Sequence, residues 1–438
     1  MKRILIELTI LFFISGFIVF FQFNQVPKKL SWDEIEFARL ALSLDGKPYT
    51  PYSQLATGHS TLYFYLLLLS LKAFGVTNFA LRFPSALFAV LNVFIFYLIA
   101  RLVFPNISYF PKGVFKKNMQ SLMPFTATFI FVSLRWYFNF ARFSFEATFL
   151  LFLELTAIYF FIKFIQLSFW ESQNRSLRQK SKLVYLLLSA IFSGLAFHSY
   201  YPGRIFFLLP LFFLFFSIKK GVLKKYIFIF LIVFTTIVSP LLFYFLSHKD
   251  IRIKEQLFLN DKNLTTREKL SYFGQNITKL ISMFHLAGDL NGRHNYPGKP
   301  TFNPVVGAFF ILGFLVAILN LQNFFNQFFL IYLAISLLPA LFTYPIENPN
   351  ILRTYTATVS TAYLTTNGLI YLFQSELKLS KLYLLVAFSL LVLFLAAAFY
   401  DLRTYFKYQK IVFKKSFELS GSLNKILRLK LWEKVGEL

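Results

Sequence analysis

The chain has 438 residues, of which 57% are hydrophobic, with a net charge of +26 and no cysteine. An ordinary soluble domain is about 45–50% apolar, whereas apolar runs of about 18–22 residues recur along this sequence, as is typical of polytopic helical membrane proteins. The basic residues form short clusters between these runs, which disfavours nucleic-acid binding and follows the positive-inside rule. The lack of cysteine excludes disulfides, thiolate nucleophiles and Cys-ligated metals.

The hydropathy pattern predicts an all-α transmembrane bundle of about eleven spans. Lys2 and Arg3 place the start of the first span in the cytoplasm, and later Lys/Arg clusters fall on alternate loops. This topology predicts one membrane domain over residues 1–400, with a first outer loop at 24–78 and a long outer loop at 247–303. The basic, aromatic tail 401–438 is expected on the outer side, against anionic headgroups. The predicted spans are residues 4–23, 79–104, 121–136, 147–167, 183–198, 205–218, 226–246, 304–321, 328–343, 356–373 and 382–400.

The first outer loop begins with a polar helix, LSWDEIEFARLALSLDG, at residues 30–46. Ser31 followed by Glu34 fits the capping-box pattern and predicts a helix start, with Gly46 as its stop. The helix is amphipathic and too short to span a bilayer, so we expect it at the membrane surface. The acidic pair Asp33 and Glu34 is either catalytic or a pair of helix-start carboxylates favoured by the macrodipole.

A second polar group follows the third predicted span and contains Arg135, Asn139, Arg142 and Glu146. Spacings of four, three and four residues put all of them on one face if the segment is helical. That face either lines a water-filled cavity or closes a span end with an i,i+4 Arg–Glu pair.

The hairpin HSYYPGR, residues 198–204, is a third group. Pro202 and Gly203 predict a turn at the outer end. Arg204 then lies at the start of a span, where a guanidinium needs an anionic partner such as a phosphate, or reaches the lipid headgroups. Tyr200 and Tyr201 are candidate substrate-binding residues beside it.

A fourth group comes from the long outer loop, GDLNGRHNYPGKP, and from the next outer loop. The glycines, asparagines and prolines predict ordered turns around Asp289, Arg293 and His294, and Arg353 adds a further cation. A lone histidine in such a loop is more often structural than a ligand. The sequence contains no P-loop, HExxH or GxSxG motif, so none of the corresponding enzyme classes is indicated.

These segments occur in an order that resembles the GT-C glycosyltransferases that use polyprenyl-phosphate sugar donors. The similarity is greatest to the protein O-mannosyltransferase and lipid A aminoarabinose transferase group, glycosyltransferase family 39. It extends over about residues 1–400. The segments that carry it are the acidic helix, TLYFYLLLLSLKAFG, ALRFPSAL, ARFSFEATF, HSYYPGR and GDLNGRHNYPGKP.

The resemblance implies an inverting transfer of a sugar, mannose among others, on the outer face of the cell membrane. Asp33 matches the first-loop catalytic carboxylate, a general base, and Glu34 is the second member of that motif. Glu146 matches a second-loop acidic residue, accompanied by Arg142. Some members of the group need a divalent cation and others do not, so Mg²⁺ or Mn²⁺ stays open and no cofactor is certain.

Donor and acceptor contacts follow from the same resemblance. Arg204 falls where the family places cations for the donor phosphate, and the family's lysine–proline element appears here as Gly58-His59-Ser60, which makes His59 a candidate replacement for a phosphate-binding lysine. The predicted partners are the lipid-linked donor, membrane lipids, and a protein, glycolipid or cell-envelope glycan acceptor. The candidate donor-phosphate residues are Arg204, Arg142, His59 and Arg353, and the candidate substrate-binding residues are Tyr200, Tyr201, Asp289, Arg293 and His294.

Two other classes remain open at this point. A transporter or flippase should show broken spans at matched positions of two halves, but no internal repeat is evident and the charges lie near span ends. A non-catalytic protein that binds polyprenyl phosphate is the other alternative, and the intact acidic pair argues against it.

Overall fold

The computed structural model describes residues 2–107, 114–169, 175–218, 224–373 and 380–428. Within these ranges, a helix runs through each of the eleven predicted spans, and seven helices are long and apolar enough to cross a membrane. The all-α fold is therefore confirmed, whereas the number of spans stays a prediction. The helices are α1 (Lys2–Phe20), α4 (Asn78–Val103), α5 (Val114–Ser133), α7 (Ala147–Phe169), α8 (Arg175–Phe197), α9 (Leu208–Ile218), α10 (Lys225–Ser247), α13 (Pro304–Leu319), α14 (Phe324–Leu341), α15 (Ala357–Leu372) and α16 (Ser380–Arg403).

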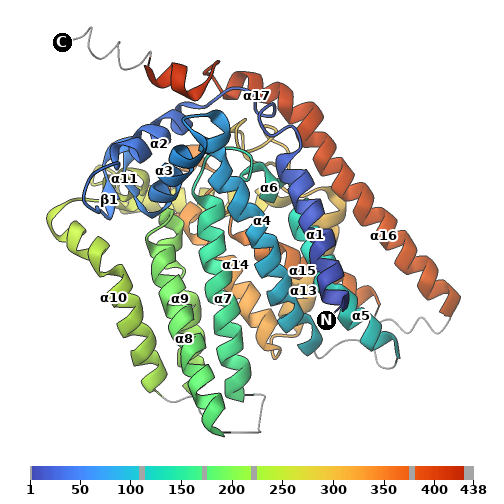
Figure 1. Cartoon of the computed structure of the whole chain (residues 1–438). Helices are drawn as coiled ribbons and strands as arrows, with labels where there is room; N and C mark the ends of the chain where they lie inside the picture. The colour runs from blue at the N-terminus through green and yellow to red at the C-terminus, as the bar shows by residue number, and fades with distance from the viewer. Residues whose placement is uncertain (1, 108–113, 170–174, 219–223, 374–379, 429–438) are drawn as a thin grey trace, which may run out of the picture.

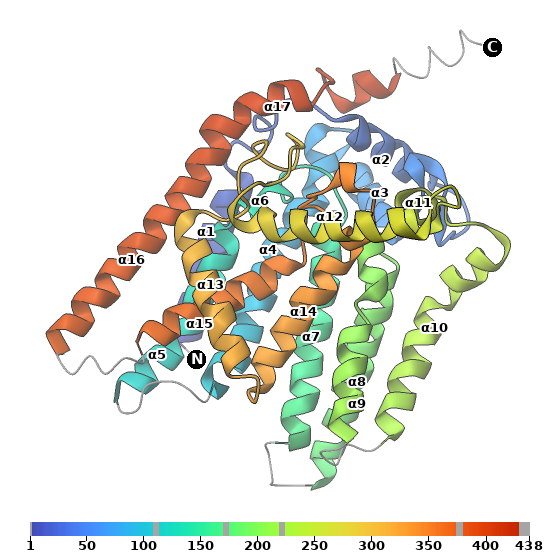
Figure 2. The same cartoon turned by 180° about the vertical axis from the view of Figure 1, so that it is seen from behind.

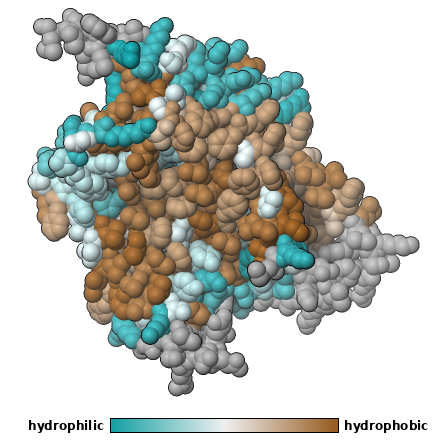
Figure 3. All heavy atoms as spheres, viewed as in Figure 1, coloured by the Kyte–Doolittle hydropathy of each residue, from teal (hydrophilic) through white to brown (hydrophobic). Residues whose placement is uncertain are grey.

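Short elements gather at one end of this bundle, which we call the site end (Figure 1). The opposite end includes the start of α1, where the chain begins. Figure 3 shows brown, hydrophobic side chains over the middle of the molecule and teal, hydrophilic ones over the site end. The short elements include α2 (Trp32–Ser43), α3 (Leu62–Phe74), α6 (Arg135–Asn139), α11 (Ile251–Gln256), α17 (Lys410–Ser416), the strands β1 (Tyr52–Ser53) and β2 (His59–Ser60), and the 3₁₀ turns η3 (Tyr201–Ile205) and η5 (Pro345–Glu347). A longer helix, α12 (Thr266–His285), lies at the same end.

The centre of the bundle is α15, whose residues are buried from Ala357 to Ile370. It packs closely against α13, because Gly313 and Gly368 let the two backbones approach where a Cβ would meet backbone atoms of the other helix. Small residues at such crossings are the usual means of close helix packing in membranes.

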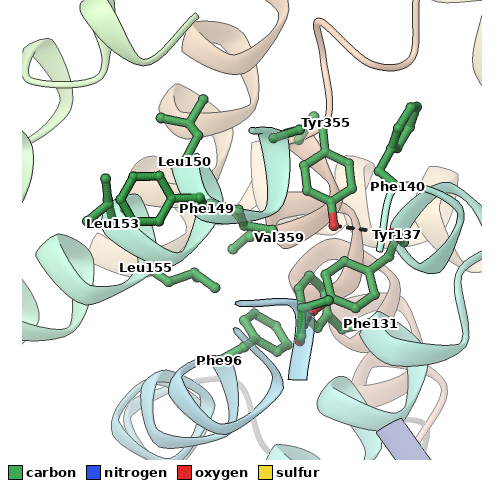
Figure 4. Close-up of a cluster of buried hydrophobic side chains, with 14 of the residues drawn as sticks. Phe96, Phe131, Tyr137, Phe140, Phe149, Leu150, Leu153, Leu155, Tyr355 and Val359 are labelled. Carbon is green, nitrogen blue, oxygen red and sulfur yellow. Dashed lines mark hydrogen bonds between the residues drawn. The ribbon is translucent and has the colours of Figure 1, made fainter. Parts of the chain in front are cut away.

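An aromatic cluster lies between α15, α4, α5 and α7 (Figure 4). The hydroxyl of Tyr355 donates to the carbonyl oxygen of Tyr137 over 3.1 Å, and their rings stack with centroids 5.9 Å apart. Phe140, in the same cluster, lies 5.6 Å from the ring of His294. The buried core thus continues directly into the loop that carries predicted site residues.

The C-terminal part of the described chain folds back over the site end. α16 runs without a break through residue 400, the predicted domain boundary, and α17 follows it. Leu419 forms an antiparallel bridge with Leu30, just before α2, with two backbone hydrogen bonds of 2.9 Å. Phe417 is fully buried against Phe143. This segment therefore closes over the base of the first loop.

Candidate active site

A polar pocket of about 400 Å³ opens at the site end. Its wall comes from α2, β2, α11, the loop before α13 and the loop before α15, segments that are far apart in the sequence. Seven of the predicted site residues line it, together with Arg252, Gln256 and Glu347. The predicted residues are Asp33, His59, Tyr200, Asp289, Arg293, His294 and Arg353.

Asp33 reaches the pocket from the first turn of α2. The helix begins with the predicted capping box: Ser31 Oγ accepts from the backbone N–H of Glu34 at 3.2 Å, and Glu34 accepts from the N–H of Ser31 at 3.0 Å. The Asp33 side chain is 51% exposed, and its Oδ2 accepts from Nη1 of Arg293 over 2.6 Å. This carboxylate is thus held at the pocket yet open to a ligand.

Glu34 points the other way. It is fully buried and accepts two hydrogen bonds from Arg82, at 2.7 and 3.0 Å, and one from the N–H of Ser144. Arg82 also donates to the carbonyl oxygens of Pro27 and Lys29. The contacts of Glu34 tie α2 to α4 and to the loop after α6, so the acidic pair divides between an open carboxylate and a buried anchor.

His59 lies on the two-stranded hairpin, where Tyr52 pairs with Ser60. Gly58 has a φ of +90°, and a Cβ at this position would collide with the phenol group of Tyr52. The N–H at Nδ1 of His59 donates to Oε1 of Glu146 over 2.9 Å. The imidazole is buried, and desolvation followed by the charge of Arg252 lowers its pKa below the ordinary 6.5. His59 is therefore neutral at pH 7, unlike a lysine.

Arg252 is the most important of the pocket residues that the sequence did not predict. Its Nη1 lies 2.9 Å from Nε2 of His59, the acceptor nitrogen, and 3.6 Å from Oε1 of Glu146, and its guanidinium stacks over the rings of Tyr200 and Tyr201 at 5.2 Å. Its Nε and the Oε2 of Glu146 are buried with no hydrogen-bond partner in the described chain. The sequence signal was an arginine two residues after Asp250, close to the end of a span.

Arg204 supports Arg252 rather than lining the same pocket. It forms an ion pair with Asp250, which caps α11 by accepting from the N–H of Ile253 and also accepts from the hydroxyl of Tyr52 at 3.1 Å. Burial alone would raise the pKa of Asp250, but the charge and hydrogen bond of Arg204 lower it below its ordinary 3.8. These contacts anchor the helix that carries Arg252.

The loop before α13 is organised by Asp289 and His294, both buried. Oδ2 of Asp289 accepts from Nδ1 of His294 at 3.0 Å and from the N–H of Ile351 at 3.1 Å. Nδ2 of Asn139 holds the loop by donating to the carbonyl oxygen of Arg293. These contacts fix the backbone from which Arg293 reaches Asp33.

Arg353 brings a further cation to the pocket. Its Nη2 pairs with Glu347, whose side chain is 40% exposed, while its Nη1 is buried and unpartnered within the described residues. The hydroxyl of Tyr201, also buried, has no hydrogen-bond partner there either. Unsatisfied buried donors are costly, so these groups mark a place where a polar ligand would complete the hydrogen bonding.

The predicted polar stripe after the third span does not form. α6 ends at Asn139, so the four residues do not share one helix face. Arg142 donates to the carbonyl oxygen of Ile18 at the end of α1 and to that of Val26 in the segment that follows, and does not pair with Glu146. Arg135 donates to Asn295 and the carbonyl oxygen of Pro300. The terminal carbonyls of α1 need donors, and satisfying them takes Arg142 away from the pocket.

The ligand set does not suit a resident metal ion. Among the described residues, no group of three or more His, Asp or Glu side chains could hold one. Each carboxylate at or beside the pocket already contacts a cationic or imidazole side chain: Asp33 with Arg293, Asp289 with His294, Glu347 with Arg353 and Glu146 with His59. We therefore derive no step through a metal.

The fold and its apolar helices define a class: a polytopic helical membrane protein. The structure is similar to the apo oligosaccharyltransferase of Archaeoglobus fulgidus, with a TM-score of 0.52 and 17% identity over 95% of this chain and 56% of that one. It is also similar to ArnT from Cupriavidus metallidurans bound to undecaprenyl phosphate, with a TM-score of 0.47 and 10% identity over 84% of this chain and 60% of that one. No family model and no curated protein matches the sequence. The chain spans little more than half the length of the archaeal protein, and the likeness concerns the fold.

Proposed function

We propose that the protein is an inverting glycosyltransferase that moves a sugar from a polyprenyl-phosphate donor to an acceptor at the outer face of the cell membrane. The observation that carries this proposal is the pocket itself. It brings together a half-exposed carboxylate, Asp33, and two arginines, Arg252 and Arg353, each with a buried N–H group that has no partner in the described chain. Displacement of a lipid phosphate requires a base near the nucleophile and preorganised cations near the leaving group.

In the proposed reaction, an acceptor hydroxyl or amine attacks the anomeric carbon and gives its proton to Asp33. The bond between that carbon and the phosphate oxygen breaks, and its electron pair leaves with the polyprenyl phosphate. Arg252 and Arg353 donate to the phosphate oxygens as this charge develops. His59 and Glu146 hold the guanidinium of Arg252. One displacement inverts the anomeric configuration, so no covalent intermediate is needed.

The outward orientation is supported by the charges at the other end of the bundle. Lys2 and Arg3 start α1 there, and Lys224 and Lys225 start α10 at the same end (Figure 1). Lys and Arg concentrate on cytoplasmic loops, so the site end, which carries the pocket, would face outward.

The test is transfer of radiolabel from a panel of polyprenyl-phosphate sugars, mannose first, to a broad acceptor mixture. Purified wild type is compared with Asp33→Asn and with a matched control, Glu36→Gln, which changes a surface carboxylate paired with Arg39 on the same helix. We expect label transfer by wild type and by Glu36→Gln but not by Asp33→Asn. Equal transfer by all three would refute the role of Asp33. No transfer by folded wild type from any donor would favour a transporter or a binding protein.

A further inference from the structure

α12, Thr266–His285, is the feature of the site end that the proposed reaction does not use. Figure 2 shows it lying across the end of α14, which it contacts, instead of running along that helix. A capping box at Thr265 and Glu268 starts it. Its orientation differs from that of every span near it, so its surface meets an environment that the spans do not.

Three different surfaces run along this helix. One faces the protein, where Leu280, Met283 and Phe284 are buried. The opposite surface is polar and exposed and includes Gln275 and Thr278. Between these two lies a third surface, an exposed apolar stripe that does not pack on the protein and is unfavourable in water.

The apolar stripe consists of Leu270, Ile277 and Ile281, which are 71%, 37% and 69% exposed. Their spacings of seven and four residues place them on one helix face. Arg267, exposed, projects beside the stripe on the polar side. An apolar stripe that adjoins a polar, partly basic face is the pattern of a helix that lies in the membrane interface.

The buried surface of α12 holds one wall of the pocket. Asn276 is fully buried; its amide donates to the carbonyl oxygens of Leu341 and Thr343 at 2.9 and 2.7 Å, and its oxygen accepts from Asn348 at 2.8 Å. Nζ of Lys279 donates to the carbonyl oxygen of Pro345 at 2.6 Å. Residues 346–350, which line the pocket, are thereby tied to α12.

We propose that α12 is a membrane-interface helix: its apolar stripe inserts among the lipids at the headgroup boundary and so fixes the pocket wall that carries Glu347 and Arg353. The partner is the bilayer surface itself. Continuity supports this choice, because α12 packs on α13 and α14, two apolar helices that run through predicted spans. The inference concerns membrane position and does not depend on which reaction the pocket performs.

Cysteine substitution tests the membrane position, since the chain has no cysteine of its own. The full chain is labelled with a nitroxide at Ile277→Cys or Ile281→Cys and reconstituted in vesicles of phosphatidylglycerol and phosphatidylcholine. Gln275→Cys and Thr278→Cys are the matched controls on the polar surface. We expect collisions with oxygen, which concentrates in lipid, to exceed those with a water-soluble nickel complex at 277 and 281, and the order to reverse at 275 and 278.

Two results would overturn the proposal. If positions 277 and 281 collide with the nickel complex as often as 275 and 278 do, then α12 stands in water above the membrane. If 277 and 281 are shielded from both reagents, then protein covers the stripe, and a partner subunit is the occupant instead. Each labelled site changes one surface residue, so the measurement does not depend on a variant that disrupts folding.

The link to the pocket wall has its own readout. A label at Ile346→Cys, a position 91% exposed on the wall, reports its mobility. Changing Leu270, Ile277 and Ile281 together to Ser should increase this mobility in vesicles. A control that changes Ser271, Gln275 and Thr278 to Ala should leave it unchanged. If the serine variant has left the lipid and the two variants still show equal mobility at position 346, then the lipid contact of α12 does not fix the pocket wall.

Discussion

The adjacent carboxylates Asp33 and Glu34 should respond in opposite ways to neutralisation. Glu34→Gln leaves the guanidinium of Arg82 buried with no counter-charge, since both side chains are fully buried and joined by two hydrogen bonds. Breaking a buried pair at one partner costs about 3–5 kcal/mol. Asp33→Asn removes a half-exposed ion pair with Arg293, and such pairs contribute about 0–1 kcal/mol.

The assay is unfolding of the purified protein in mixed micelles of dodecyl maltoside with increasing dodecyl sulfate, followed by far-ultraviolet circular dichroism. We expect Glu34→Gln to unfold at a clearly lower mole fraction of dodecyl sulfate, because about 3 kcal/mol changes the unfolding equilibrium by roughly a hundredfold. Asp33→Asn should unfold close to wild type. Sugar transfer should respond differently from stability: Asp33→Asn should lose transfer completely although the protein stays stable.

The result that would refute this reasoning is an Asp33→Asn variant destabilised as much as Glu34→Gln. It would mean that Asp33 is also a structural anchor, and its loss of transfer could no longer be assigned to chemistry. A Glu34→Gln variant as stable as wild type would show that Arg82 is satisfied by its two backbone acceptors, Pro27 and Lys29, alone.

Three further changes probe Arg252, its anchor and the bundle. Arg252→Gln should raise the KM for the lipid-phosphate donor roughly ten- to a hundredfold, because a hydrogen bond to a charged group contributes about 1.5–3 kcal/mol, whereas Lys254→Gln, exposed on the same helix, should leave it near wild type in the transfer assay. The Arg204 ion pair lowers the pKa of Asp250 in the folded state. The stabilisation from this ion pair is therefore present above the ordinary pKa of 3.8 and is lost as pH falls through the pKa of the folded state. The stability difference between wild type and Asp250→Asn should shrink below about pH 3.8 in the micelle assay. Gly368→Val should destabilise the bundle by about 1–3 kcal/mol or more, since its side chain would meet the backbone of α13.

Each of these changes has an outcome that contradicts it. An unchanged donor KM in Arg252→Gln would remove this residue from donor binding. A stability difference at Asp250 that stays constant from neutral to acidic pH would mean that its charge is not what stabilises the fold. For the glycine, the matched control is Gly16→Val, in α1 with nothing near a Cβ; equal unfolding of the two valine variants would disprove the close approach of α13 and α15.

Local patterns predicted the elements well. Apolar runs located the helices, because each membrane-spanning segment must satisfy its own backbone hydrogen bonds and its length is set by the bilayer. The capping box of α2 was predicted from Ser31 and Glu34, since it joins groups only three residues apart. The predicted stripe from Arg135 to Glu146 failed because the terminal carbonyls of α1, far away in sequence, bind Arg142 and the helix ends early.

What the sequence by itself determined is therefore the class of fold, the approximate positions of the apolar helices and the segments that carry polar chemistry, all of which depend on neighbours along the chain. Only the tertiary structure decided that Asp33 faces the pocket while Glu34 is buried on Arg82, and that Arg252 enters the pocket while Arg204 holds the helix behind it. Adjacent residues of one type carry the same local signal. Their roles differ because the pocket is built from loops more than two hundred residues apart, and only packing brings those loops together.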